Sequence, residues 1–124
     1  MAIEEGLKQV SADAGADLSA AANQFKAVKL DANGAVVLCS AITDVTFGIL
    51  QDVAVAGKAV PVAVGGICKA KAGATIAAGA PVATKADGTL QTAATTQYVI
   101  GVARFGGVSG DIISVQLQPA VLKA

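Results

Sequence analysis

The sequence predicts an all-β fold: a small β-barrel or β-sandwich built from two pseudo-repeated β units, with an extended N-terminal arm. Three observations predict it. Short segments alternate apolar and polar residues, glycine-containing turns separate these segments, and one order of segments and turns occurs twice. The 124 residues are the length of one domain.

Residues 1–22 carry no sustained helical or strand periodicity, so they predict an arm that is extended or weakly ordered. A single β domain then spans residues 23–124. We expect this domain to fold without residues 1–20, and the arm to serve attachment instead.

Strand signals begin directly after the arm. Residues 25–30 alternate cleanly, and Asn33-Gly34 follows, which is the strongest short signal for a β-hairpin. Residues 35–39 are the predicted return strand. Residues 60–64 and 113–117 alternate again and are rich in β-branched side chains.

The repeat covers residues of about 25–68 and 79–118. One set of matched positions is separated by 53 residues and an upstream set by 54. The matches are Gly48 with Gly101, Gly57 with Gly110 and Val60 with Ile113, and upstream Val28 with Val82 and Gly34 with Gly88. One unit alone exposes an apolar face, so we expect the two to close over a shared core.

The composition favours a structural or binding role over catalysis. The chain has no His, which removes the commonest general base and metal ligand. Lys+Arg and Asp+Glu are nine each, and aromatic residues make up 3%, so the basic, stacking surface that nucleic acid needs is missing. We expect no catalytic residue, cofactor, metal, small-molecule substrate or nucleic-acid partner.

Mean hydropathy is +0.64 with 15% charged residues, yet 28 Ala and 16 Val give a core of small side chains. We therefore expect apolar surface to be shared with other chains in a homo-oligomer. No run approaches the roughly 20 apolar residues of a membrane span, and the acidic N-terminus does not resemble a secretory signal. Cys39 and Cys68 fit no C-x-x-C pattern and are predicted to be reduced, buried thiols.

The polar motifs have structural explanations. Residues 106–111 resemble a phosphate loop, but a strand pattern follows where a phosphate loop needs a helix. Asp31, Asp87 and Asp111 lie in predicted turns, where Asp chiefly bonds backbone. Lys69 and Lys71 are predicted to share a solvated strand face, and Arg104 with Phe105 is a candidate interface pair beside Gly106-Gly107.

The order and spacing of several motifs resemble tailed-bacteriophage capsid decoration (head cement) proteins. The motifs are residues 14–19, 25–34, 47–51, 56–62, 73–79, 98–103 and 110–119. The resemblance implies a non-enzymatic virion protein that binds the outside of the head, commonly as a homotrimer, and stabilises contacts between major capsid subunits. It also implies synthesis in the host bacterial cytoplasm and arm-to-shell contacts around Leu7, Val10 and Leu18.

Two alternatives stay open. The first is another virion structural module, such as a tail or baseplate adaptor or a fibre base. The second is a lipoyl- or biotinyl-like carrier domain, which is also a duplicated β unit. A carrier presents a modifiable Lys at a hairpin tip, whereas the tips here are Asn33-Gly34 and Asp87-Gly88.

Overall fold

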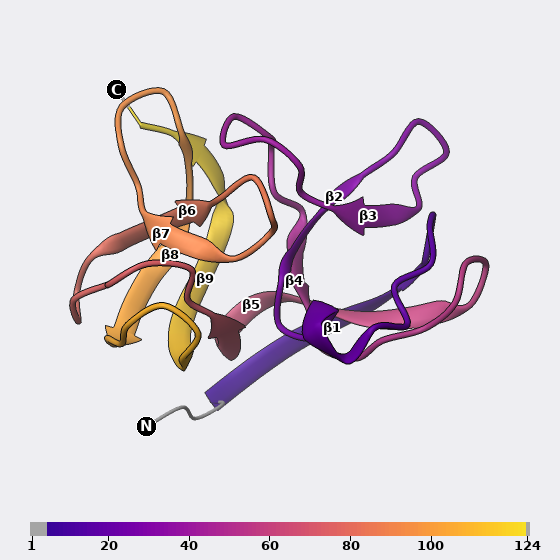
Figure 1. Ribbon diagram of the computed structural model, residues 1–124, viewed down its shortest axis with the longest axis horizontal. Coiled ribbons are helices and arrows are strands. Elements are labelled where there is room, and N and C mark those ends of the chain that lie inside the picture. Colours follow the sequence, from indigo (N-terminus) through magenta and orange to yellow (C-terminus); the bar gives the residue numbers. More distant parts are fainter. Residues whose placement is uncertain (1–4, 124) are drawn as a thin grey trace.

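The computed structural model describes residues 5–123, and its main elements are strands (Figure 1). A 3-10 helix, η1 (Ala21–Asn23), lies between the first two strands. The strands pair in the order β3-β2-β4-β5-β9-β8-β6-β7, and β1 pairs with β5 outside this path. The all-β prediction is confirmed. The strands are β1 (Glu5–Asp13), β2 (Ala27–Leu30), β3 (Val36–Leu38), β4 (Gly48–Leu50), β5 (Ala59–Lys71), β6 (Pro81–Thr84), β7 (Leu90–Thr92), β8 (Tyr98–Phe105) and β9 (Ile112–Leu122).

The sheet curls into two lobes on either side of β5 (Figure 1). We call them the first unit (β1 to β4 with residues 59–65 of β5) and the second unit (residues 66–71 of β5 with β6 to β9). In the first, β2 pairs with β3 and β4, and β4 pairs with β5. In the second, β6 pairs with β7 and β8, and β8 pairs with β9. The two units share one topology, which confirms the pseudo-repeat.

The strand register repeats as well. Pairs in β2 and β3 recur 54 residues later in β6 and β7, and pairs in β4 and β5 recur 53 residues later in β8 and β9. Examples are Val28–Leu38 with Val82–Thr92, and Ile49–Ala63 with Val102–Gln116. The turns agree, since Gly34 and Gly88 both have positive φ, as the predicted hairpins require.

The repeat extends into residues 8–18, which the sequence pattern assigns to the arm. β1 pairs with the first half of β5 in the same way that the second half of β5 pairs with β9. Each residue of this N-terminal segment corresponds to the residue 58 positions later in the chain. Val10 pairs with Val62 as Cys68 pairs with Val115, and Ala14 bridges Val36 as Ala72 bridges Leu90.

Leu18 completes this equivalence. Its N–H donates to the carbonyl of Ala54 at 2.9 Å, and the N–H of Ile76, 58 residues on, donates to that of Gly107 at 2.8 Å. Both side chains are 2% exposed. Deleting residues 1–20 would remove β1 and two core side chains, so we propose that the β domain needs this segment to fold, in place of the expectation that it folds without it.

Each unit has its own core of seven equivalent positions. The core of the first unit is one cluster, and its seven counterparts lie in the second, larger cluster. The first set is Ala14, Leu18, Val28, Val36, Leu50, Val60 and Val62, and the second is Ala72, Ile76, Val82, Leu90, Ala103, Ile113 and Val115. The larger cluster also takes in Ala27, Cys39, Ile49 and Ala63 from the first unit. The predicted shared core is thus two small cores and a junction between them.

Candidate functional site

The turn carboxylates bond backbone, as predicted. Asp31 accepts from the N–H groups of Asn33 and Ala35, Asp87 accepts from Thr89, and Asp111 accepts from the N–H of Val108 at 2.9 Å. Within residues 5–123 there is no pocket and no group of three or more side chains suited to hold a metal.

The two cysteines lie in the larger core cluster, where both side chains are buried. Burial raises the pKa of the Cys39 thiol above its ordinary value, and its hydrogen bonds with Thr46 and Thr84 oppose this without reversing it. The thiol therefore stays protonated and acts as a small core residue.

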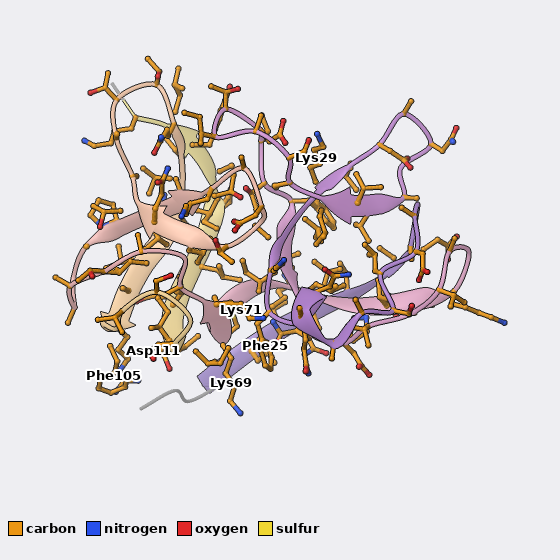
Figure 2. The ribbon with its side chains drawn as sticks, viewed as in Figure 1. Phe25, Lys29, Lys69, Lys71, Phe105 and Asp111 are labelled. Atoms are coloured by element: carbon orange, nitrogen blue, oxygen red, sulfur yellow. The ribbon has the colours of Figure 1, made fainter. Side chains whose placement is uncertain are left out.

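Of the two lysines predicted to share a solvated strand face, Lys71 has a structural role. Lys71 and Lys69 lie near Phe25 in Figure 2, at the end of β5. The Nζ of Lys71 donates to the carbonyl of Ala22 at 2.8 Å, so this side chain connects the second unit to the first. Arg104 lies over the ring of Phe105, with 5.4 Å from Cζ to the ring centroid.

Exposed apolar side chains are the clearest functional signal. Ten large ones are exposed among the described residues, and three of them lie in the β3–β4 loop (residues 39–47). They are Val10, Leu30, Ile42, Val45, Phe47, Val55, Val102, Val108, Val121 and Leu122. We call Ile42, Val45 and Phe47 the loop patch. Apolar patches held at a surface are typical of interaction sites.

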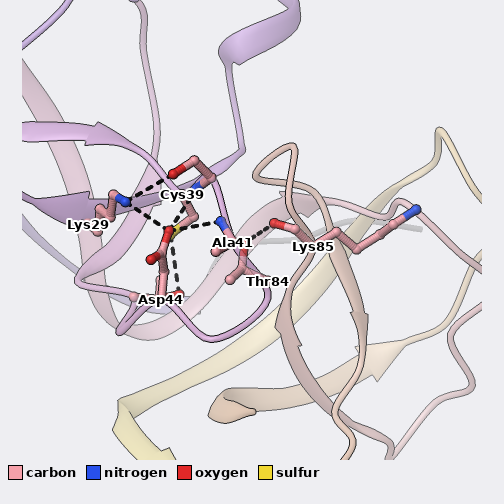
Figure 3. Close-up of polar contacts among 8 residues, drawn as sticks. Lys29, Cys39, Ala41, Asp44, Thr84 and Lys85 are labelled. Atoms are coloured by element: carbon pink, nitrogen blue, oxygen red, sulfur yellow. Dashed lines mark hydrogen bonds and ion pairs between the residues drawn. The ribbon is translucent and has the colours of Figure 1, made fainter.

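Asp44 holds this loop in place (Figure 3). Its Oδ2 accepts from the N–H of Ser40 at 2.8 Å and from the N–H of Ala41 at 3.0 Å. The Nζ of Lys29, on β2, lies 3.0 Å from the same oxygen and also donates to the Ser40 hydroxyl. One carboxylate thus closes the turn and ties it to the sheet.

The far side of the loop is attached too. Cys39 and Thr46 share a hydrogen bond of 3.6 Å between Sγ and Oγ1, and the N–H of Phe47 donates to the carbonyl of Val28 at 2.8 Å. Because the backbone is held at several points, the loop patch loses little conformational entropy when a partner covers it.

Asp44→Asn is expected to lower the free energy of unfolding by about 1 kcal/mol near neutral pH, because bonds to a charged acceptor weaken. Burial alone raises the pKa of Asp44, but its bonds with Ser40, Lys29 and Ala41 outweigh this and hold the pKa below its ordinary value of 3.8. Because its pKa is lowered by folding, the ionised Asp44 carboxylate stabilises the fold at pH values above the ordinary pKa. This contribution is lost as the pH falls through the lower, folded-state pKa.

The difference between wild type and Asp44→Asn should therefore shrink below about pH 3.8. Chemical denaturation at neutral and acidic pH measures this difference. Asp52→Asn is the matched control, because Asp52 is exposed and bonds only the adjacent N–H of Val53. An Asp44→Asn deficit that is independent of pH would contradict this account.

An apolar loop that hydrogen bonds and an ion pair hold at the surface of an all-β chain fits an assembly component. Comparison with protein families decides which kind: the model of the phage cement protein family matches residues 19–116. The chain belongs to the phage cement protein family. The resemblance seen in the sequence is confirmed, and the chain is a viral structural protein of the capsid decoration type.

A solved structure of this cement protein's fold comes from a phage head. The N base of the head fibre gp8.5 of bacteriophage phi29 matches with a TM-score of 0.64 and 16% sequence identity. The match covers 95% of this chain and 99% of that one, so the two share a fold over nearly their whole lengths. Curated protein sequences yield no match. No helix of residues 5–123 has the length and apolar character to span a membrane.

The three predicted contact residues of the cement protein lie in different surroundings. Val10 is exposed on β1, Leu7 is half-buried against the larger core cluster, and Leu18 is buried in the core of the first unit. The structure does not bring them together on one surface. The sequence pattern did not predict the loop patch, because its residues show no alternation. Three large apolar residues within six positions between strands were nevertheless a usable signal.

Proposed function

We propose that this cement protein binds the outer surface of the phage head as a homotrimer and stabilises contacts between major capsid subunits. Family membership supports a cement role in the capsid. The observation that supports a binding site is the loop patch, an apolar surface held in place by hydrogen bonds, on a chain whose described residues form no pocket.

The physical basis of cementing is linkage. A protein that binds the assembled shell better than its separated subunits stabilises the assembly by the free energy of that binding. Three copies around one axis add avidity, so each contact can be modest. The proposed role needs no reacting group, and accordingly we propose that the protein is not an enzyme.

The loop patch is the proposed shell contact, and the exposed Val10 on β1 is a proposed second one. Ile42 and Val45 are about half exposed and Phe47 about one-third exposed, so covering them removes apolar area from water. The capsid exterior is accordingly the proposed location, after synthesis in the host bacterial cytoplasm.

The triple variant Ile42→Ser, Val45→Ser, Phe47→Ser should bind purified mature heads about 100-fold more weakly than wild type. Partial burial of three such side chains is worth about 3 kcal/mol, and each 1.4 kcal/mol is about tenfold. Co-sedimentation of labelled protein with heads measures the affinity, and circular dichroism checks the fold.

The matched control is Val55→Ser with Val108→Ser, two exposed valines at equivalent turn tips, which should bind as wild type. Val10→Ser tests the predicted contact on β1 separately. Heads bound equally well by the triple variant and by wild type would rule out the loop patch. A wild-type protein that ignores mature heads would rule out the cement function itself.

A fibre base is the second candidate, since the phi29 protein of similar fold is described as the base of a head fibre. A fibre base also sits on a head but carries a further protein. Cryo-electron microscopy of virions distinguishes the two, because density that continues outward from this chain would favour the fibre base.

A further inference from the structure

The junction between the two units has different residues on its two sides. The first unit contributes Ala27, Cys39, Ile49 and Ala63, which lie outside its own core and pack in the larger cluster. Their equivalents in the second unit are Pro81, Ala93, Val102 and Gln116, and none of these belongs to that cluster. The units therefore pack head to tail, and the relation between them is not a two-fold axis.

The second unit meets the first through its β6–β7 hairpin. The carbonyl of Gly88 accepts from the N–H of Ala27 at 2.7 Å, and the Thr84 side chain lies close to the Cys39 thiol. A Cβ built on Gly88 lies 3.3 Å from the Cβ of Lys26. The equivalent hairpin of the first unit, β2–β3, meets nothing in this way, since a Cβ on Gly34 has open space around it.

A head-to-tail junction leaves one face of each unit unused, and each unused face carries an exposed large apolar residue, beside the exposed Gln116 in the second unit. Leu30 stands where the second unit has Thr84, and Val102 stands where the first unit has Ile49. Leu30 is 47% exposed against 1% for Thr84, and Val102 is 39% exposed against 0% for Ile49. Exposed large apolar residues thus occupy positions that the internal junction buries.

We propose that a second copy of this chain covers these faces, so that the first unit of one copy packs on the second unit of the next as the units pack within one chain. The inference deepens the proposed homotrimer and rests on it. A head-to-tail contact closes when its rotation completes a ring, so each copy in the homotrimer uses both faces.

The contact between copies differs from the internal junction in one respect. Pro81 replaces Ala27 and has no N–H, so the bond that Gly88 accepts internally has no counterpart at Gly34. Apolar burial of Leu30 and Val102 replaces that hydrogen bond. The Asn33-Gly34 turn and Pro81 carry no charge, so packing them against each other buries none.

Engineered disulfides test the geometry. The double variant Gly34→Cys, Ala80→Cys places one thiol of each neighbouring copy at the contact between them. These positions correspond to Gly88 and Lys26, which face each other in the internal junction. Oxidation should give covalent oligomers that end at one closed species on a non-reducing gel. Gly88→Cys with Lys26→Cys is the matched control, because Gly34 and Gly88 have φ of 79° and 85° and Cys brings the same backbone strain at both. The control should close within one chain, since its Cβ separation is near the roughly 3.5–4.5 Å of disulfides. Closure of the control without covalent oligomers from the first pair would overturn the proposal.

Charge substitutions give a second test that needs no cysteine. Leu30→Asp and Val102→Asp should each reduce the oligomer to monomers in light scattering, with unchanged circular dichroism. A one-to-one mixture of the two variants should form dimers only, because each pair retains one intact junction. Wild-type mass in either variant would overturn the proposal, and loss of head binding at wild-type mass would show that the shell covers these faces. Head binding is scored separately, so a cross-linked protein that ignores heads would refute the cement function and leave this inference standing.

Discussion

Leu18→Ala and Ile76→Ala should each lower the free energy of unfolding by about 2–5 kcal/mol, the range for truncating a buried large aliphatic side chain. The two side chains are equivalent members of the two unit cores, and each is 2% exposed. Cores composed largely of Ala and Val contain few large side chains, so each one supplies a large share of the buried apolar area. Urea denaturation followed by circular dichroism measures both variants.

Val108→Ala is the control, because Val108 is exposed on a turn and should change stability by less than about 0.5 kcal/mol. The comparison of Leu18 with Ile76 also tests where the domain begins. A Leu18→Ala variant as stable as wild type would mean that residues 14–18 belong to a separable arm. Similar losses at both positions would support a domain that includes β1 and the segment after it.

Gly48→Ala and Gly101→Ala should each destabilise the fold by about 1–3 kcal/mol or more, the usual range for overpacking a closed site. These glycines are equivalent positions in β4 and β8, where the neighbouring strand approaches closely. A Cβ on Gly48 would meet the carbonyl oxygen of Ala63 at 2.4 Å, and one on Gly101 would meet that of Gln116 at 2.2 Å. Both obstacles are backbone atoms, so relief requires the strands to move apart.

Gly65→Ala is the matched control, because Gly65 also lies in a strand but its added Cβ would meet only the Lys8 side chain, at 3.4 Å. It should be neutral or slightly stabilising, since Ala restricts the unfolded chain more than Gly does. Thermal unfolding of the three variants gives the comparison. Equal stability of all three would contradict the close strand approach at Gly48 and Gly101.

Much of the fold could be predicted because its signals are local. Alternation in residues 25–30 and the Asn33-Gly34 turn specify a hairpin within ten residues of chain. Gly48 and Gly101 recur because the same close approach of strands occurs in both units, so the separation of 53 residues reflects a shared packing requirement. Turn carboxylates such as Asp31 were predictable for the same reason, since their bonds reach backbone only two to four residues away.

The place of Leu18 was not predictable in this way. Its counterpart, Ile76, is 58 residues away instead of 53 or 54, because the linkers that follow the two residues differ in length. The surrounding Ser, Ala and Gly residues carry no periodicity, and Leu18 is buried by strands that come much later in the chain. The loop patch is similar, because one of the contacts that hold its loop is the ion pair between Asp44 and Lys29 of β2, which lies earlier in the chain.

The amino-acid sequence alone was enough to predict the all-β class, the two-unit repeat, the hairpin turns and the resemblance to capsid cement proteins. Each of these depends on residue types at short or repeated spacings, which the chain carries wherever it folds. The packed structure was needed to show that β1 belongs to the first unit, that the units join head to tail, and which apolar side chains stay exposed. Those features depend on which distant strands cover a given face, and burial is a property of the packed neighbours rather than of the residue.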